Sequence, residues 1–113
     1  GADYLWVATL DSRVVGLAGL IVNKEEAEIE PLIVSQPYRN KGIGRRLVET
    51  MVAEAHKQGV RFLTVKPVAR NMAAVGFFHK QGFRNIGHVE LFIDFSKQQW
   101  KKGLKLFDLQ FDY

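Results

Sequence analysis

Runs of apolar residues separated by short polar turns open the chain and predict strands. Residues 4–10 are rich in aromatic and β-branched side chains, and residues 14–23 form a second such run after the polar turn at 11–13. We therefore expect an antiparallel hairpin. Gly16 and Gly19 lie inside the second run, where glycine indicates a bulge or a close approach of another backbone.

Residues 27–34 are predicted to form a third strand with an unusual pattern. Glu28 and Glu30 lie two residues apart, so both side chains leave the same face of the strand. Pro31 removes a backbone donor in mid-strand, which predicts an interrupted ladder or a bulge. Unpaired N–H groups beside such an interruption can face a ligand.

The hydrophobic period changes to that of a helix over residues 43–57. Apolar residues at 43, 47, 48, 51, 52 and 55 share one helix face, and Gly59 follows where a left-handed C-cap is expected. Residues 61–65 are predicted to form a strand, and a strand–helix–strand unit implies a parallel, right-handed crossover. Because Pro67 prevents further pairing, we expect the third strand and this one to part into a cleft.

A second helix is predicted over residues 69–81. Asn71 lies at or near its N-cap, and Gly82 follows its end. The pattern up to this point indicates an α/β protein with a mixed α+β sheet.

Two strands are predicted to close the chain. Residues 83–95 read as one long strand, and residues 96–103 form a polar, lysine-rich connection. Residues 104–113 alternate between apolar and polar positions, apart from Phe107, and predict the last strand. We expect a single domain over residues 1–113.

Composition removes several classes of function. The chain has 113 residues and no cysteine, which excludes disulfides, thiolate zinc sites and thiol nucleophiles. His56, His79 and His88 are scattered without the spacing of metal ligands, so no metal site is expected. No apolar run approaches the roughly 18 residues of a membrane span, and no signal-peptide pattern is found. These features predict a cytoplasmic protein.

The stretch between the third strand and the first helix carries the chemistry. The first N–H groups of a helix lack partners within it, and the helix dipole adds partial positive charge there. Gly42 and Gly44 remove side chains that would keep a phosphate from the backbone. The basic residues around the same turn are Arg39, Lys41, Arg45 and Arg46. The pattern suits a pyrophosphate or a nucleotide phosphate, and the alternative is a helix start whose glycines serve packing alone.

Two common phosphate-binding loops are excluded by the residues after this turn. A P-loop needs Lys-Ser/Thr after its second glycine, and Arg45 stands there instead. A dinucleotide-binding turn needs a third glycine, and the chain has Leu47. The net charge is +4, and nucleic-acid binding would predict a basic stripe with interleaved aromatic residues. The basic residues concentrate instead at 39–46, where a phosphorylated cofactor explains them, and at 97–105, which is typical of a solvated loop. Nucleic-acid binding is therefore kept only as an alternative.

The turn resembles the Arg/Gln-x-x-Gly-x-Gly/Ala signature of the GNAT family of N-acetyltransferases. Arg39, Gly42 and Gly44 match it, and a strand that carries glutamates precedes it. The residues that follow at the spacing of the family's second cofactor helix are Asn71, Ala74, Phe78, Gly82 and Phe83. The resemblance is clear over residues 14–83.

The resemblance implies a GNAT-like fold with acetyl-CoA in the cleft between the third strand and the strand after the helix. The third strand would offer backbone groups to the pantetheine, with the N–H of Ile33 or Val34 as oxyanion donor. The turn would wrap the pyrophosphate, and the second helix would line the other side. The implied cofactor residues are Leu32, Ile33, Val34, Arg39, Asn40, Lys41, Gly42, Ile43, Gly44, Arg45, Asn71 and Phe78.

The resemblance also implies a general base. Glu28 aligns without a gap, counted back from Arg39, with the strand glutamate that acts as base in the histone-acetylating branch. Glu30 lies on the same face and is the second candidate. The alternative is that both are solvated strand residues, or carboxylates that attract a cationic substrate.

Two departures from the family pattern qualify these roles. Many members have a tyrosine, placed to protonate the leaving thiolate, where this chain has Phe78. The family also begins with a strand and one or two helices that this chain is expected to lack. It is therefore expected to be a short form, a fragment, or a chain completed by a partner, and an uncovered strand edge makes a homodimer the corresponding hypothesis.

Three functions follow from this sequence. The first is an N-acetyltransferase that moves an acetyl group from acetyl-CoA to a primary amine of a small molecule or a protein, by direct attack. The second is a non-catalytic CoA-binding or sensor domain, which Phe78 and the missing N-terminal elements favour. The third is a basic nucleic-acid or interaction module, whose affinity would fall steeply with salt and would need no CoA.

Overall fold

The computed structural model describes residues 3–113, which divide into two compact units, the first ending at Lys66 and the second covering Pro67–Tyr113. Each unit is described by itself below. The single domain expected over residues 1–113 stays a prediction.

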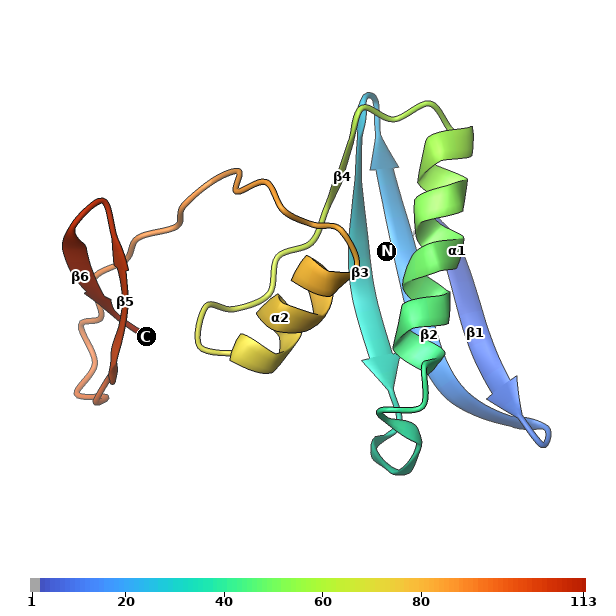
Figure 1. Cartoon of the computed structure of the whole chain (residues 1–113), viewed down its shortest axis with the longest axis horizontal. Coiled ribbons are helices and arrows are strands. Elements are labelled where there is room, and N and C mark those ends of the chain that lie inside the picture. Colours follow the sequence, from blue (N-terminus) through green and yellow to red (C-terminus); the bar gives the residue numbers. More distant parts are fainter. Residues whose placement is uncertain (1–2) are drawn as a thin grey trace. The chain divides into compact units, whose positions relative to one another are not determined.

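The first unit is a four-stranded sheet with one long helix (Figure 1). The strands are β1 (Tyr4–Leu10), β2 (Arg13–Asn23), β3 (Glu26–Val34) and β4 (Phe62–Thr64), in the order β1-β2-β3-β4. The first three pair antiparallel, and β4 pairs parallel to β3 after the helix α1 (Ile43–Lys57). The predicted hairpin, third strand and βαβ crossover are therefore confirmed.

The core of this unit lies between α1 and one face of the sheet. The buried apolar residues are Val15, Ala18, Leu20, Ala27, Ile29, Leu47, Val48, Met51 and Ala55. Four of the six predicted face positions of α1 are among the helix residues that the structure buries, whereas Val52 is 42% exposed. The helix ends as predicted, because Gly59 adopts a φ of 75° just after the C-cap Gln58.

Gly16 allows α1 to approach β2 closely. A Cβ built on Gly16 would lie 3.2 Å from Cγ2 of Ile43, 3.2 Å from Cδ1 of Leu47 and 3.3 Å from Cβ of Ala8. These separations are tighter than ordinary van der Waals contact, so an added Cβ would require the neighbouring side chains to shift by a few tenths of an ångström. The atoms that approach Gly16 belong to side chains and not to another backbone. The predicted bulge is found instead, because the register of β1 and β2 shifts between the pairs Ala8–Gly16 and Thr9–Val14.

A bulge in β3 exchanges the two faces of that strand. Ile29 pairs with Leu20 and Leu32 pairs with Ala18, so Glu30 and Pro31 together lie opposite a single residue of β2. Leu32 and Val34 consequently share the helix-facing side with Ile29, although strict alternation would have put them on the other side. The interruption predicted from Pro31 is confirmed.

The second unit contains α2 (Met72–Lys80) and a hairpin of β5 (Lys102–Leu106) and β6 (Leu109–Asp112). Asn71 is the N-cap of α2, and its Oδ1 accepts a hydrogen bond from the amide of Ala74 at 3.1 Å. The helix is shorter than the predicted residues 69–81 because residues 69 and 70 form a turn before the cap. None of the helices described for residues 3–113 has the length and apolar character needed to cross a bilayer.

A short polar turn lies between α2 and the hairpin. The carboxylate of Asp94 accepts hydrogen bonds from the amide of Ser96 and from Nε1 of Trp100, both at 2.7 Å. The Ser96 contacts, followed by the indole, lower the pKa of the Asp94 carboxyl. The guanidinium of Arg70 lies 4.9 Å from the centre of the Trp100 ring.

The positions of the two C-terminal strands differ from the prediction, although their number is confirmed. Residues 83–95 form no strand in the described structure. Their large apolar side chains are exposed apart from the half-buried Phe83, with Phe95 at 93%. Alternation indicates which faces a strand would have, but a ladder also needs a neighbour for its N–H and C=O groups. The prediction of a strand over residues 83–95 is wrong for this structure.

Residues 104–113 form part of a hairpin, where one strand was predicted. Phe107 and Asp108 have φ values of 55° and 62°, so both central residues of the turn are left-handed. This is the geometry of a two-residue hairpin turn whose twist matches that of the strands. Phe107, which interrupts the alternation in the sequence, marks this turn.

Candidate functional site

The turn between β3 and α1 places unpaired amide groups at the start of the helix. A 3₁₀ turn, Gln36–Tyr38, leads from β3 into it, and Asn40 then adopts a φ of 63°. Gly42 is the N-cap of α1 with a φ of 84°, and no side chain caps this helix end. The first backbone bond runs from the amide of Arg46 to the carbonyl of Gly42 at 3.1 Å. The preceding amides of Gly44 and Arg45 are therefore free to meet an anion.

Open space surrounds this helix start. A Cβ built on Gly42 would meet only one atom within 4 Å, a guanidinium nitrogen of Arg45 at 3.9 Å. A ligand can therefore reach the backbone here. The positive φ of Gly42 is a second reason for glycine, because side chains are strained in that conformation.

The basic residues of the turn hold different positions. Nε of Arg39 donates to the carbonyl of Val34 at 2.9 Å, so this guanidinium ties the turn to the end of β3. Nζ of Lys41 lies 5.7 Å from the centre of the Tyr38 ring. Both side chains stay beside the turn, but Arg39 has a structural contact that the sequence did not reveal.

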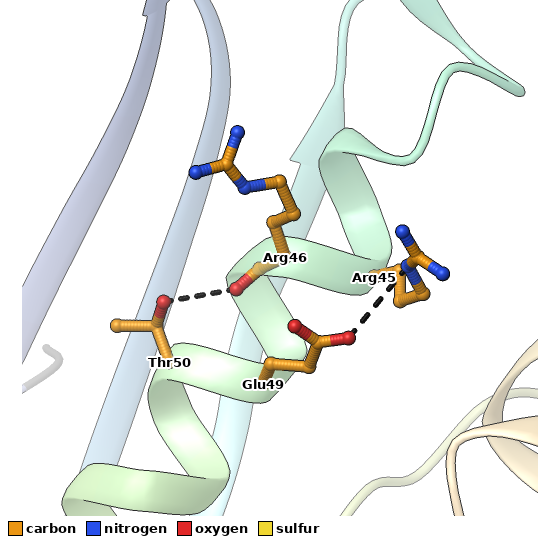
Figure 2. Close-up of polar contacts among 4 residues, drawn as sticks. All are labelled: Arg45, Arg46, Glu49 and Thr50. Carbon is orange, nitrogen blue, oxygen red and sulfur yellow. Dashed lines mark hydrogen bonds and ion pairs between the residues drawn. The ribbon is translucent and has the colours of Figure 1, made fainter.

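Figure 2 shows the first turns of α1, where Arg45 and Arg46 point to different sides of the helix. Nε of Arg45 lies 3.6 Å from Oε1 of Glu49, and both side chains are more than 60% exposed. Oγ1 of Thr50 donates to the carbonyl of Arg46 at 2.9 Å. Because an exposed pair of this length is weak, the Arg45 guanidinium can turn to an anion at the helix start.

Beyond its first residues, β3 has one open edge. Its pairing with β4 covers only Glu26–Glu28, whereas its pairing with β2 continues to Val34. The two strands therefore part after Glu28, as the predicted cleft requires. The part of β3 implied in pantetheine binding, Leu32, Ile33 and Val34, lies along this open edge.

The hydrogen bonds of β3 indicate which amides face that edge. The amide of Ser35 donates to the carbonyl of Val15 at 2.8 Å, so Ser35 points toward β2. Because backbone groups alternate between the two edges of a strand, Ile33 also points toward β2, and Leu32 and Val34 point away from it. The Arg39 bond to the Val34 carbonyl agrees with this direction.

Glu28 lies where β3 and β4 part. It pairs with Thr64, the last residue of the short ladder, and its Oε1 lies 3.0 Å from Nζ of Lys66. The Glu28 side chain is 25% exposed and that of Lys66 is 68% exposed. The hydrogen bond that Lys66 donates to Glu28, followed by the Glu28 charge, raises the pKa of the Lys66 ammonium above its ordinary value. Desolvation opposes this rise, and Glu30 and Glu26 add smaller contributions to it.

Lys66 was not predicted as a site residue. The predicted parallel pairing of residues 61–65 with the third strand already implies that Lys66 lies close to the glutamates. The residue could therefore have been identified from the sequence. Glu30, the second base candidate, is an exposed residue of the bulge. Of the two carboxylates, Glu28 is the one that an ion pair holds at the fork.

Asn71 and Phe78 belong to the second unit, so their place beside the turn stays a prediction. In that unit, Oδ1 of Asn71 serves as the cap of α2. The Phe78 ring packs edge to face against Phe77 and Phe83, at centroid distances of 5.1 and 5.6 Å. Within residues 3–113, no three metal-ligating side chains lie together.

A family comparison identifies this arrangement. The family model described as "Acetyltransferase (GNAT) family" matches residues 1–83. The chain belongs to this family. The match includes the β3 edge, the turn and α2, so the resemblance of the turn to the GNAT signature and the predicted fold class are both confirmed.

Relatives of this GNAT chain are N-acetyltransferases. The [ribosomal protein bS18]-alanine N-acetyltransferase of Escherichia coli strain K12 is 31% identical over 84 residues, which are 74% of this chain and 57% of the relative. The solved structure of the Escherichia coli ribosomal-protein-S18-alanine N-acetyltransferase has a TM-score of 0.69 at 27% identity, covering 74% of this chain and 54% of that one. The chain thus spans little more than half the length of these relatives.

Another solved structure contains a ligand. A Bacillus anthracis (strain Ames) protein, described as a streptothricin acetyltransferase, was solved in complex with acetyl coenzyme A. Its TM-score is 0.66 at 28% identity, over 69% of this chain and 45% of that protein.

Proposed function

We propose that this GNAT chain forms the cofactor-binding part of an N-acetyltransferase, which transfers the acetyl group of acetyl-CoA to a primary amine. The observation that supports it most is the uncapped start of α1 beside the open edge of β3. The start of α1 suits the pyrophosphate of acetyl-CoA. The free amides of the β3 edge suit the pantetheine arm of the same molecule. Acetyl-CoA, when bound, supplies the activated thioester.

The residues of the first unit have distinct tasks in this proposal. The amides at 42–45 receive the pyrophosphate, and Lys41 and Arg45 add positive charge around it. Leu32 and Val34 offer backbone groups to the pantetheine arm. An amide on the same open edge can donate to the thioester oxygen, where negative charge develops during attack. Because the Ile33 amide points toward β2, this donor is Leu32 or Val34.

Glu28 is the proposed general base. An acceptor amine with a pKa of about 10.4 is protonated near neutral pH, and it must lose a proton before it attacks the thioester. Glu28 lies where the strands part, so its carboxylate can take that proton directly or through one water molecule. Asn71 and Phe78 are proposed to line the cofactor from α2. Phe78 has no proton to donate, and a thiol with a pKa near ~8.5 leaves without one at modest cost.

A second function has one observation in its favour. Lys66 already pairs with the Glu28 carboxylate, and a non-catalytic CoA-binding domain needs no free carboxylate as a base. Such a domain would bind acetyl-CoA by the same turn and transfer nothing. A cytoplasmic location and a homodimer through an edge strand stay predictions.

An acetyl-transfer assay with a panel of primary amines tests the proposal. We expect the chain to release CoA in the presence of an amine, and Glu28→Gln to lower kcat/KM by about 100-fold, the usual contribution of a general base. Glu25→Gln is the matched control, since Glu25 is an exposed residue of the turn before β3 and should keep full activity.

The outcomes separate the candidates. Full activity in Glu28→Gln would remove Glu28 as the base, and a loss confined to Glu30→Gln would transfer the role to Glu30. Binding of acetyl-CoA without transfer to any amine would favour the non-catalytic domain. Absence of acetyl-CoA binding would contradict both functions.

A further inference from the structure

The ion pair between Lys66 and Glu28 connects two strands where their hydrogen-bonded ladder stops. Glu28 and Thr64 form the last pair between β3 and β4. Lys66 follows Thr64 by two residues, and its Nζ returns across the gap to Oε1 of Glu28 at 3.0 Å. The carboxylate is therefore held at the fork from the strand opposite its own.

We propose that Lys66 is a positioning residue for Glu28: its ammonium fixes Oε1 at the fork and leaves Oε2 free to take the proton of the acceptor amine. This role rests on the proposed acetyltransferase function. Without Lys66, no other ion pair among the described residues holds the Glu28 side chain, so the carboxylate could sample other rotamers. Small displacements of a catalytic group lower the rate substantially.

The charges around Lys66 favour its protonated form. Glu28 raises the Lys66 pKa above its ordinary value, and Glu30 and Glu26 contribute in the same direction. Lys66 therefore carries its positive charge at neutral pH, as the pair with Glu28 requires. The pair is largely exposed on the Lys66 side and therefore contributes little to folding stability.

A double-mutant cycle in the acetyl-transfer assay tests this role. We expect Lys66→Met to lower kcat about tenfold and to leave the KM for acetyl-CoA unchanged, because the residue acts on the base and not on the cofactor. Lys66→Arg, which keeps the cation, should recover most of the loss. In a Glu28→Gln background, Lys66→Met should have no further effect. Lys57→Met, an exposed lysine at the end of α1, is the matched control and should equal the wild type.

A second measurement does not depend on activity. In an NMR titration of the lysine Cε signals, the Lys66 pKa should fall toward its ordinary value in Glu28→Gln and stay unchanged in Glu49→Gln. A Lys66 pKa that is the same in Glu28→Gln as in the wild type would show that the two side chains do not pair in solution, and would overturn the proposed role of Lys66.

The results distinguish this role from the proposed function. If the wild type transfers no acetyl group to any amine, the proposed function fails and the catalytic role of Lys66 fails with it. If the wild type is active and Lys66→Met equals it, only the role of Lys66 is overturned. The role of Lys66 is also overturned if Lys66→Met lowers the activity by the same factor in the Glu28→Gln background as in the wild-type background. A Lys66→Arg variant no better than Lys66→Met would also overturn it.

Discussion

Gly42 combines two requirements in one residue. Its φ of 84° begins α1 in a conformation that disfavours side chains, and its missing Cβ leaves the helix start open to a ligand. Gly59, at the other end of the same helix, has a φ of 75° and open space around it, but it faces no proposed ligand. The two glycines therefore offer a comparison in which the backbone strain is similar and only the site differs.

We predict that Gly42→Val weakens acetyl-CoA binding by at least about tenfold, whereas Gly59→Val leaves the affinity unchanged. Each substitution should cost about 1–2 kcal/mol of stability because of its left-handed backbone. Isothermal titration calorimetry with acetyl-CoA measures the affinities, and thermal unfolding checks that the two variants are destabilised alike. Equal affinities for the two variants would contradict a phosphate site at the start of α1.

The residues of the turn were predictable from sequence, but their contacts were only partly so. Gly42, Gly44 and the basic residues follow from the chemistry of a helix start. The bond from Arg39 to the Val34 carbonyl and the pair between Lys66 and Glu28 depend on distances across the fold. No local pattern encodes those distances.

At the scale of elements, the bulge of β3 decides which residues face the site. Glu28, before the bulge, lies on the sheet face away from α1, and the bulge places Ile33 on that same face. It places Leu32 and Val34 on the face toward α1. Pro31 predicted an interruption in the sequence, but the exchange of faces depends on how many residues of β2 lie opposite it. The sequence therefore indicated the position of the bulge and not its effect.

The distance between α1 and β2 yields a stability prediction. Gly16→Ala should destabilise the fold by about 1–3 kcal/mol, because its Cβ would press on Ile43 and Leu47 at 3.2 Å. Gly76→Ala is the control: it lies in α2, nothing lies within 4 Å of its added Cβ, and alanine favours a helix. Denaturant unfolding followed by circular dichroism measures both. A Gly16→Ala variant as stable as the wild type would contradict the close packing of α1 on β2.

The C-terminal elements show where sequence patterns fail. Alternation over residues 83–95 predicts a strand, and the structure gives these residues no ladder. Periodicity describes one segment, whereas a strand depends on a partner segment. The hairpin turn at Phe107 and Asp108 was visible only as an interruption of the alternation, since left-handed turns usually carry glycine or asparagine.

For the whole molecule, the features that carry the proposal lie in the first unit. The parted strands β3 and β4, the uncapped start of α1 and the Lys66–Glu28 pair all lie within Gly1–Lys66. The central claim is therefore that acetyl-CoA binds along β3 and at the start of α1.

An NMR titration of the ¹⁵N-labelled chain with acetyl-CoA tests that claim most directly. We expect the largest amide shifts at Leu32 and Val34 on the open edge of β3, and at Gly42, Gly44 and Arg45 at the start of α1. The Ile33 amide, which points into the ladder with β2, should shift less than its two neighbours. No shifts at these amides, or shifts confined to residues 67–113, would contradict the account.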